Sequence, residues 1–549
     1  MLSLVASAFE YTGLILIFQF LLILTNPNSI HVTKIISFFK NSFNIDNFAC
    51  ISLTIGVSVA LIYILKNIYL YIYTKISCFV LQDLSVAITT QLAKKILFCD
   101  FAKVNSLSND IKQGLFSKTN IVVWEYINQY ITLITNASII AILLLFLFIK
   151  FTCAAIIACI FIGILSFIEF KILKYKSDYQ KKYFPVYFDE SNKIIYMIVN
   201  AAKEIRLNNK SGYFLSKMEE KYNDLATINK KASADKVFHI YFTEISIMST
   251  LIIVLVVLYF SSEFSNKTVI LTLGTIIAVI LRITPAFNRL QSSIYGINSN
   301  ENLAKDILEF DNNFKEMPEI IESDEKLPFE NQIELENVSY RYPNSKYNIK
   351  NINLTVKKGE FIGIVGASGC CKTTLSLIIS GLIMPQKGKI VIDKTPLNYK
   401  NVKQWQNNIS ILSQDFSLIK DDIFEGVSQE ITDKLELSEF NSNPLELSFG
   451  QKQRAALAQT IAQDKNVIIL DEATSSLDVI SEDKINKILL ELKGKKTIIS
   501  IAHRLQILKH CNRIIYMDNG EIIDIDTFQT LAGKYPKFKE MIDLSNFTL

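Results

Sequence analysis

The sequence carries little net charge and no organised set of cysteines. Its 57 Lys and Arg residues nearly balance 53 Asp and Glu residues, giving a formal net charge of +4, so nothing indicates a nucleic-acid partner. The eight cysteines are scattered, and no spacing suggests a metal site or a disulfide framework. A reducing cytoplasm therefore suits the soluble part of the chain. The first apolar run follows no basic leader, so we expect no cleaved signal peptide.

Apolar residues are abundant and unevenly distributed. Half of the 549 residues are hydrophobic, and the mean hydropathy of +0.27 is high for a soluble protein. The excess is confined to roughly the first 300 residues, after which charged residues become frequent. This distribution predicts a membrane part followed by a soluble part.

Long apolar runs define the membrane part. The second run continues without further glycine or proline to about Phe98, and the fourth continues to about Asn200, so both helices are expected to extend well beyond the bilayer. The amphipathic stretch 30–43 suits a helix lying at the membrane interface, or an ordinary loop helix packed on protein. A bilayer crossing takes about 20 residues, and six spans are expected near 2–24, 48–65, 131–148, 153–170, 240–260 and 269–286.

Basic residues orient these spans. The long connections 66–130 and 171–237 carry seven and 13 lysines, and the second also carries Arg206. The opposite side carries only Lys34, Lys40, Lys150 and Lys267. Because basic connections favour the cytoplasm, both termini are expected there, in a multi-pass protein of the cytoplasmic (inner) membrane.

The soluble part contains a near match to a phosphate-binding loop. An apolar strand, Phe361–Val365, leads into a glycine-rich turn and an apolar helix, 375–382. Backbone N–H groups of such a turn bind phosphate, while Lys372 can reach outer phosphates and the Thr373 hydroxyl can hold Mg²⁺. The pattern requires glycine where this chain has Cys371, so a positive φ costing about 1–2 kcal/mol is expected there. The loop comprises Gly366, Ala367, Ser368, Gly369, Cys370, Cys371, Lys372, Thr373 and Thr374.

Further motifs follow in a fixed order. The buried strand 467–470 ends in Asp471 and Glu472, and strand 497–501 is followed closely by His503. Taken singly, each has an ordinary structural interpretation, such as the edge of a sheet or a packed aromatic residue. Together with the loop, the ordered set is Tyr342, Gln414, Leu447, Ser448, Phe449, Gly450, Gln451, Asp471, Glu472, Ser476, Leu477, Asp478 and His503.

This order resembles the nucleotide-binding domain of ABC transporters. The resemblance covers 331–549, and the six-span part, 1–310, looks like an exporter-type transmembrane domain, with 311–330 as a linker. The implied fold is a membrane α-helical domain followed by an α/β P-loop NTPase domain with a helical subdomain. Short coupling helices between the domains are expected near Asn109–Gln113 and Ala202–Lys210.

The resemblance implies roles for the residues that bind ATP. Tyr342 would stack on adenine, and the loop amides with Lys372 would bind the β- and γ-phosphates. Thr373 and Gln414 would hold Mg²⁺, with Asp471 behind a water molecule. These roles fit phosphoryl transfer, which needs positioning, a metal and charge neutralisation.

The same resemblance implies catalytic and dimer roles. Glu472 would polarise the attacking water and His503 would contact the γ-phosphate. The signature residues 447–451, with Ser448 and Gly450 foremost, would complete the ATP site of a second subunit, and 476–478 would form the D-loop. The short connection between Gln414 and Ser448, and Gln459 in place of the usual arginine, depart from the family pattern.

The sixth span resembles that of bacterial flippases for lipid-linked oligosaccharides. Arg282 and Arg289 are seven residues apart and share one helical face, where two guanidinium groups suit a pyrophosphate headgroup. Alternatively, Arg289 extends to the membrane interface and binds no substrate.

We therefore expect an ATP hydrolase coupled to transport, which flips or exports an amphipathic anionic substrate as a homodimer in the lipid bilayer. The substrate that we expect is a lipid-linked oligosaccharide. A peptide or lipid exporter of the same fold is an alternative, and so is a heterodimer. A third possibility is a membrane binding protein that clamps on ATP but hydrolyses little of it because of Cys371.

Overall fold

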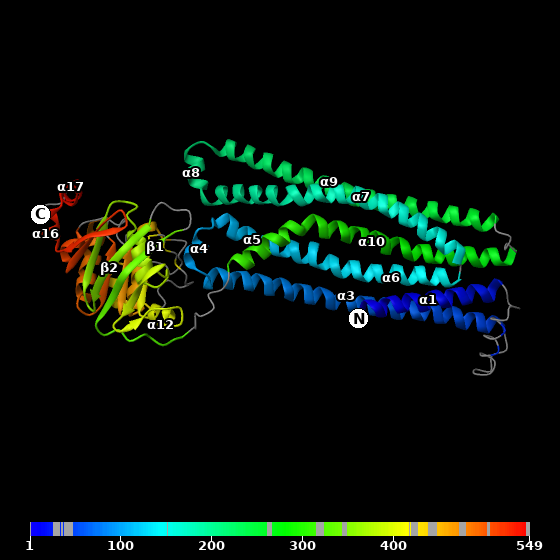
Figure 1. Cartoon of the computed structure of the whole chain (residues 1–549), viewed down its shortest axis with the longest axis horizontal. Helices are drawn as coiled ribbons and strands as arrows, with labels where there is room; N and C mark the ends of the chain where they lie inside the picture. Colours follow the sequence, from blue (N-terminus) through cyan, green and yellow to red (C-terminus); the bar gives the residue numbers. More distant parts are fainter. Residues whose placement is uncertain are drawn as a thin grey trace. The chain divides into compact units, whose positions relative to one another are not determined.

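A computed structural model describes residues 2–25, 33, 37, 48–150, 152–260, 266–314, 323–342, 348–414, 416, 418, 426–437, 447–471, 479–501 and 506–544. The chain divides into two compact units, whose helices and strands are labelled in Figure 1. Unit 1 comprises Met1–Lys94 and Leu107–Asn313, and unit 2 comprises Lys95–Ser106 and Phe314–Leu549.

Unit 1 is built of long helices, as expected from its apolar runs. The second expected span lies in a helix that ends at Phe98 and the fourth in a helix that ends at Asn200, so both predicted extensions are confirmed. The stretch 30–43, predicted to lie at the interface, falls outside the described residues except for 33 and 37. The helices are α1 (Leu2–Thr25), α3 (Phe48–Phe98), α5 (Asn109–Val122), α6 (Asn128–Lys150), α7 (Thr152–Asn200), α8 (Ala202–Leu207), α9 (Ser211–Phe260) and α10 (Asn266–Asn313).

Hydrophobic surface explains why unit 1 suits a bilayer. Among the described residues, three helices are long and apolar enough to cross a membrane: Cys50–Phe98, Asn109–Ile149 and Ser211–Ile253. On α3, large apolar side chains recur every three or four residues on the outside, as at Val57, Leu61 and Ile64. Such exposure is costly in water and favourable in lipid.

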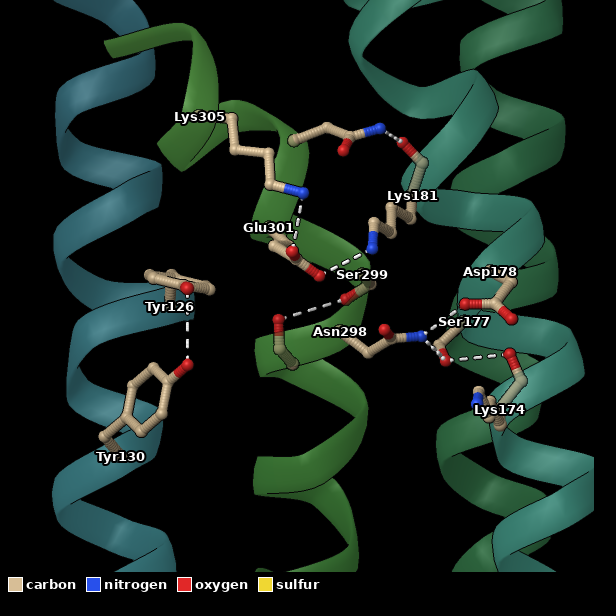
Figure 2. A network of polar contacts seen from close by, with 12 residues as sticks. Tyr126, Tyr130, Lys174, Ser177, Asp178, Lys181, Asn298, Ser299, Glu301 and Lys305 are labelled. Carbon is tan, nitrogen blue, oxygen red and sulfur yellow. Dashed lines mark hydrogen bonds and ion pairs between the residues drawn. The ribbon is translucent and has the colours of Figure 1, made fainter. Parts of the chain in front are cut away.

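Helices α7 and α9 pack along each other, and α10 packs against α6, α7 and α9. Parts of α7 and α10 are joined by polar contacts, as Figure 2 shows. Lys181 on α7 pairs with Glu301 on α10 at 2.5 Å, and the Asn298 amide donates to Asp178 at 2.8 Å. Beyond them, the buried Lys118 of α5 joins carboxylates of both helices.

A second polar cluster ties α7, α9 and α10 together deeper in unit 1. The Glu169 carboxylate is almost fully buried and lies 3.2 Å from His239 Nδ1. Thr243 on α9 and Gln291 on α10 also donate to it, each at 3.3 Å. A buried carboxylate is costly unless hydrogen-bonded, so these three donors make its position tolerable.

Unit 2 contains two sheets. The first has strand order β2-β1-β4-β5 and is antiparallel; the second has order β10-β9-β3-β8-β7-β6, with β6, β7, β8, β3 and β9 parallel. The strands predicted at 361–365, 467–470 and 497–501 are confirmed, and they form the buried centre of this second sheet. The strands are β1 (Gln332–Arg341), β2 (Asn348–Lys357), β3 (Phe361–Gly366), β4 (Lys387–Ile392), β5 (Thr395–Pro396), β6 (Ile409–Leu412), β7 (Val467–Asp471), β8 (Thr497–Ile501), β9 (Arg513–Asp518) and β10 (Glu521–Asp526).

Helices cover both faces of the parallel sheet. The hydrophobic core on one face includes Leu375 and Ile378 of α11, and the core on the other includes Leu457 of α14 and Leu489 of α15. A parallel sheet buried on both faces gives β3, β7 and β8 their continuous apolar sequences. The helices are α11 (Lys372–Ile379), α12 (Val402–Gln406), α13 (Gln429–Lys434), α14 (Phe449–Ala462), α15 (Val479–Leu492), α16 (Phe528–Lys534) and α17 (Pro536–Leu544).

Candidate nucleotide site and membrane cavity

The phosphate loop joins β3 to α11, as the sequence predicted. At Gly366 an added Cβ would lie 2.2 Å from the carbonyl oxygen of Met517, so only glycine lets β3 and β9 approach so closely. Helix α11 begins at Lys372, and its first N–H groups open toward the loop. A helix start preceded by a glycine-rich turn is a site for anions.

Cys371 occupies the left-handed region, with φ of 73°, which confirms the expected positive φ. It stands directly before α11, where the pattern calls for glycine. Burial raises the pKa of its thiol, and also that of the neighbouring Cys370. Both thiols are therefore kept protonated, which opposes activation by oxidants because the thiolate is the reactive form.

Lys372 is buried inside the loop. Its Nζ donates to the carbonyl oxygens of Gly366 at 2.9 Å and Ala367 at 3.1 Å. These contacts hold the ammonium group at the loop itself, so its charge is already located where an anion would bind. An ammonium ion held in this way needs little rearrangement to meet a phosphate.

The order of the sheet brings further polar residues to the same edge. Strand β8 lies between β3 and β7, and in the register Ile501 pairs with both Ile364 and Asp471. Gln414 follows the end of β6, the next strand along. Because carboxyl ends of parallel strands meet at one edge, Asp471 and Gln414 end on the edge that carries the loop.

The oxygen atoms at this edge fit a magnesium ion. The Thr373 hydroxyl, the Asp471 carboxylate and the Gln414 amide supply the hard ligands that Mg²⁺ prefers. Asp471 is buried, as expected for a residue that ends a central strand. The predicted residues Glu472, Ser476, Leu477, Asp478 and His503 lie outside the described residues, so their roles stay predictions.

Tyr342 lies beside the loop, immediately after β1. Its ring meets that of Tyr340 edge to face, with centroids 5.2 Å apart. Burial raises the pKa of its hydroxyl, and the ring packs against the hydrophobic core that includes Leu375 of α11. An aromatic ring so close to the first turn of α11 is within reach of a nucleotide whose phosphates occupy the loop.

The signature residues form the start of α14. The Ser448 hydroxyl accepts from the backbone N–H of Gln451 at 3.3 Å, while Gln451 Oε1 accepts from the N–H of Ser448 at 2.7 Å. This reciprocal capping box fixes the helix start. The Phe449 side chain is 59% exposed on the surface of unit 2, where its ring contacts that of Phe416. Leu447 is buried, and Gly450 belongs to the first turn.

The short helix of the first long connection lies earlier than predicted. Helix α4 (Phe101–Asn105) packs with unit 2, where Ala102 belongs to the hydrophobic core. The predicted position, Asn109–Gln113, is wrong because those residues begin α5 of unit 1. The signal missed in the sequence was Asp100, whose side chain accepts from the Ala102 N–H and caps α4. The second predicted segment contains α8.

Unit 1 encloses a cavity of about 460 Å³ between α3, α6 and α10. Arg282 and Arg289 both line it, so the structure brings the two predicted cations to one cavity. Lys66 lines it as well, although the sequence analysis placed that residue just past the end of its span. No described residue of its lining is acidic. Its polar lining also includes Asn67, Tyr73, Thr74, Ser77, Asn128, Thr132, Thr135 and Asn136.

Comparisons with known proteins agree with both units. Residues 349–475 match the family model described as ABC transporter. The nisin transport ATP-binding protein NisT of Lactococcus lactis subsp. lactis is 29% identical over 388 residues, which cover 63% of each chain. The ATP-dependent lipid A-core flippase of Bordetella avium (strain 197N) is 33% identical over 236 residues, covering 38% of this chain and 40% of the flippase. These alignments span only part of each relative.

The fold also resembles that of a solved transporter. A bacterial Atm1-family ABC exporter with ATP bound superposes with a TM-score of 0.73 at 15% identity, over 98% of both chains. The chain therefore has the fold of an ABC exporter. Within this fold, the chain carries one helical domain of membrane type, followed by one domain that matches the ABC transporter family model.

Proposed function

We propose that the chain uses ATP to flip or export an amphipathic anionic substrate, a lipid-linked oligosaccharide, across the membrane. The observation that carries this proposal is the cavity, which gathers Lys66, Arg282 and Arg289 without an acidic neighbour among its described lining residues. Guanidinium groups bind phosphate oxygens in pairs, so this lining suits a phosphate or pyrophosphate headgroup. Apolar helix surfaces around it suit the lipid part.

The nucleotide site would drive the transport. Lys372 and the loop amides would bind the β- and γ-phosphates, and Tyr342 would stack on adenine. A bound Mg²⁺ would neutralise phosphate charge, with Thr373 and Gln414 as the residues to hold it and Asp471 behind a water molecule. Glu472 would orient and polarise the attacking water, and His503 would contact the γ-phosphate.

We propose a homodimer, in which the signature residues would belong to the ATP site of the second copy. Ser448 and Gly450 of one copy would complete the ATP site of the other, so that ATP closes the two domains and hydrolysis opens them. A chain with one membrane domain and one nucleotide-binding domain supports this arrangement. A heterodimer with a related chain would use the same residues.

Two alternatives have an observation in their favour. The similarity to a nisin transport protein, which covers more of the chain than the flippase match, supports a peptide substrate. The side chain at the strained Cys371 supports an ATP clamp that hydrolyses slowly. The cationic lining of the cavity favours the anionic lipid over a cationic peptide.

Steady-state ATPase activity of the full chain in lipid tests the proposal, with Glu472→Gln beside it. Turnover in the native chain that is lost in the variant would support a pump, and unchanged turnover would refute the catalytic role of Glu472. Stimulation by a pyrophosphate-linked glycolipid, and none by peptides, would support the substrate class. No native turnover, with recovery in Cys371→Gly, would support the clamp.

A further inference from the structure

A break in helix geometry lies beside the cavity. Between α5 and α6, the turn η1 (Val123–Ile127) is π-helical, and the N–H of Asn128 bonds to the carbonyl of Val123, five residues back. In an α-helix the partner would be four residues back. The π-helical turn therefore holds one residue more than an α-helical turn would, and such turns concentrate at functional positions.

The extra residue decides which side chains face the cavity. Each residue turns an α-helix by about 100°, so an added one rotates every later side chain by that angle. The part before the turn is fixed, because Lys118 of α5 is bonded to Asp189 and Asp306. The orientation of α6 relative to α5 thus follows from η1.

With η1 present, the wall that α6 contributes is mainly polar. Asn128, Thr132, Thr135 and Asn136 line the cavity, and Ile131 and Ile139 are the apolar residues of α6 beside them. In an uninterrupted α-helix each position would pass to the preceding residue, so Ile127, Ile131 and Ile134 would take the places of Asn128, Thr132 and Thr135. Ile134 now has 56% of its surface exposed on the outside of unit 1.

Helix α10 stabilises the π-helical turn through one side chain. The buried amide of Asn300 donates to the carbonyl of Glu125 in η1 at 3.2 Å and to the carbonyl of Gly296 on its own helix at 2.9 Å. An added residue displaces carbonyls from their usual amide partners, and a donor from a neighbouring helix compensates for this. Figure 2 shows this region, where Tyr126 of η1 and Tyr130 of α6 join through their hydroxyls.

Gly296 allows the close approach that this bond needs. A Cβ at this position would lie 2.9 Å from Gln129 Cγ and 3.3 Å from the Glu125 carbonyl oxygen. Any side chain would push α10 away from η1. Gly296 and Asn300 are four residues apart and so share one face of α10.

We propose that Asn300, with Gly296, is a positioning residue for the substrate cavity. Its amide maintains the π-helical turn, and the turn presents a mainly polar face of α6 to the substrate. The role of Asn300 in substrate binding rests on the proposed function, in which this cavity takes the substrate. The register of α6 is set by η1 whatever the cavity binds.

Cysteine labelling measures the register directly. Thr132→Cys and Ile134→Cys are each introduced into the full chain and treated with a water-soluble maleimide in lipid, and mass spectrometry reads each cysteine separately. The native Cys78, which lines the cavity, is the internal standard. We expect Thr132→Cys to react at a rate similar to Cys78, and Ile134→Cys to react several-fold more slowly.

Asn300→Ala and Asn300→Asp should then change this pattern. Both variants remove the amide donor, and the aspartate side chain keeps the shape of the asparagine side chain. Labelling at Thr132→Cys should therefore fall several-fold, and labelling at Ile134→Cys should rise. Asn302→Ala is the matched control, because Asn302 makes the same type of bond to the Lys181 carbonyl of α7, at 2.9 Å, and should leave labelling unchanged. Unchanged labelling in both Asn300 variants would overturn the proposal.

Glycine variants give an independent test. Gly296→Ala should shift the labelling in the same direction, while Gly212→Ala, whose added Cβ meets nothing within 4 Å, should not. In transport assays, Asn300→Ala should raise the KM for the anionic lipid several-fold and leave basal ATP turnover unchanged. A labelling shift without any response to anionic lipids would refute the proposed substrate and leave the register proposal supported.

Discussion

The guanidinium carbon of Arg282 lies 4.4 Å from the centre of the Tyr63 ring, beside the cavity of unit 1. The same ring lies 5.4 Å from the Lys66 ammonium nitrogen, so one aromatic residue of α3 contacts two of the three cations. Its hydroxyl end is close to Gly13 of α1, where an added Cβ would lie 3.1 Å away. Tyr63 therefore fixes the positions of charges on two helices.

Replacing Tyr63 should weaken binding of the proposed headgroup. Cation–π contacts contribute about 1–2 kcal/mol in sites away from water, so Tyr63→Leu should raise the lipid concentration for half-maximal ATPase stimulation roughly tenfold. Tyr63→Phe keeps the ring and should stay near the native value. Equal effects of the two variants would mean that the hydroxyl, and not the ring, carries the role.

The two arginines should act on substrate and not on ATP. Arg282→Ala combined with Arg289→Ala should abolish stimulation by a pyrophosphate-linked lipid while the KM for ATP stays constant, because both residues lie in unit 1. Arg282→Lys with Arg289→Lys keeps the charge but loses the paired donors, and should retain part of the response. Intact flipping in the double alanine variant, measured in proteoliposomes, would refute the headgroup role.

Cys371→Gly should relieve backbone strain in the phosphate loop. Glycine adopts the φ of 73° freely, so the variant should be more stable by about 1 kcal/mol, provided that the loop keeps its conformation. Cys371→Ala removes the thiol but retains the Cβ, and should show no such gain. Thermal unfolding of the two variants separates strain from thiol chemistry, and a similar gain in both would contradict the explanation.

Lys118→Met should loosen the part of unit 1 where α5, α7 and α10 meet. The ammonium nitrogen lies 2.9 Å from Asp189 and 2.8 Å from Asp306, and the lysine side chain is 7% exposed, against 50% and 40% for the carboxylates. Losing these ion pairs should lower the free energy of unfolding of this region by about 1–3 kcal/mol. The loss stays below the full value for a buried pair because water reaches both carboxylates. Hydrogen exchange in α5, α7 and α10 measures this loss of stability.

The control is Lys305→Met, which removes an ion pair at 2.7 Å from Glu301 with a lysine 55% exposed. Exposed ion pairs contribute little to stability, so the free energy of opening measured by hydrogen exchange should change by less than about 0.5 kcal/mol. A comparable loss in both variants would show that burial of Lys118 has no special effect.

Glu360 should make unit 2 sensitive to acid. Its carboxylate bonds to Arg513 Nε at 2.6 Å and Nη2 at 3.0 Å. Although burial alone would raise the pKa of Glu360, this paired guanidinium lowers it below the ordinary 4.5. The pair therefore stabilises the fold above that ordinary pKa, and this stability is lost as the pH falls through the lowered value.

Glu360→Gln removes the titrating group and tests this sign. The variant should unfold more easily than the native chain near neutral pH, and the difference should shrink as the solution is acidified. Hydrogen exchange in β2 and β9, measured across this pH range, gives the comparison. A difference that grows with acid would contradict the pKa direction.

The nucleotide-binding part of the fold was largely predictable from the sequence. The apolar strands, the loop before α11 and the positive φ at Cys371 follow from local patterns. Residues that are neighbours in the sequence determine both the burial of a strand and the conformation of a turn. The long helix ending at Phe98 also followed from a run without further glycine or proline, whereas the helix ending at Asn200 continues through Pro185. Local sequence determines these features because the contacts that create them are close along the chain.

Tertiary structure decided the rest. In the sequence, Lys66 lies just past the end of its span, and only the placement of α3 beside α6 and α10 makes it part of a cavity with Arg282 and Arg289. No local pattern predicts the π-helical turn, because its carbonyl is satisfied by Asn300, 175 residues further along the chain. The sequence by itself determined a phosphate site and a set of spans. The fold decided which side chains face the cavity, because that depends on the rotation of helices against distant neighbours.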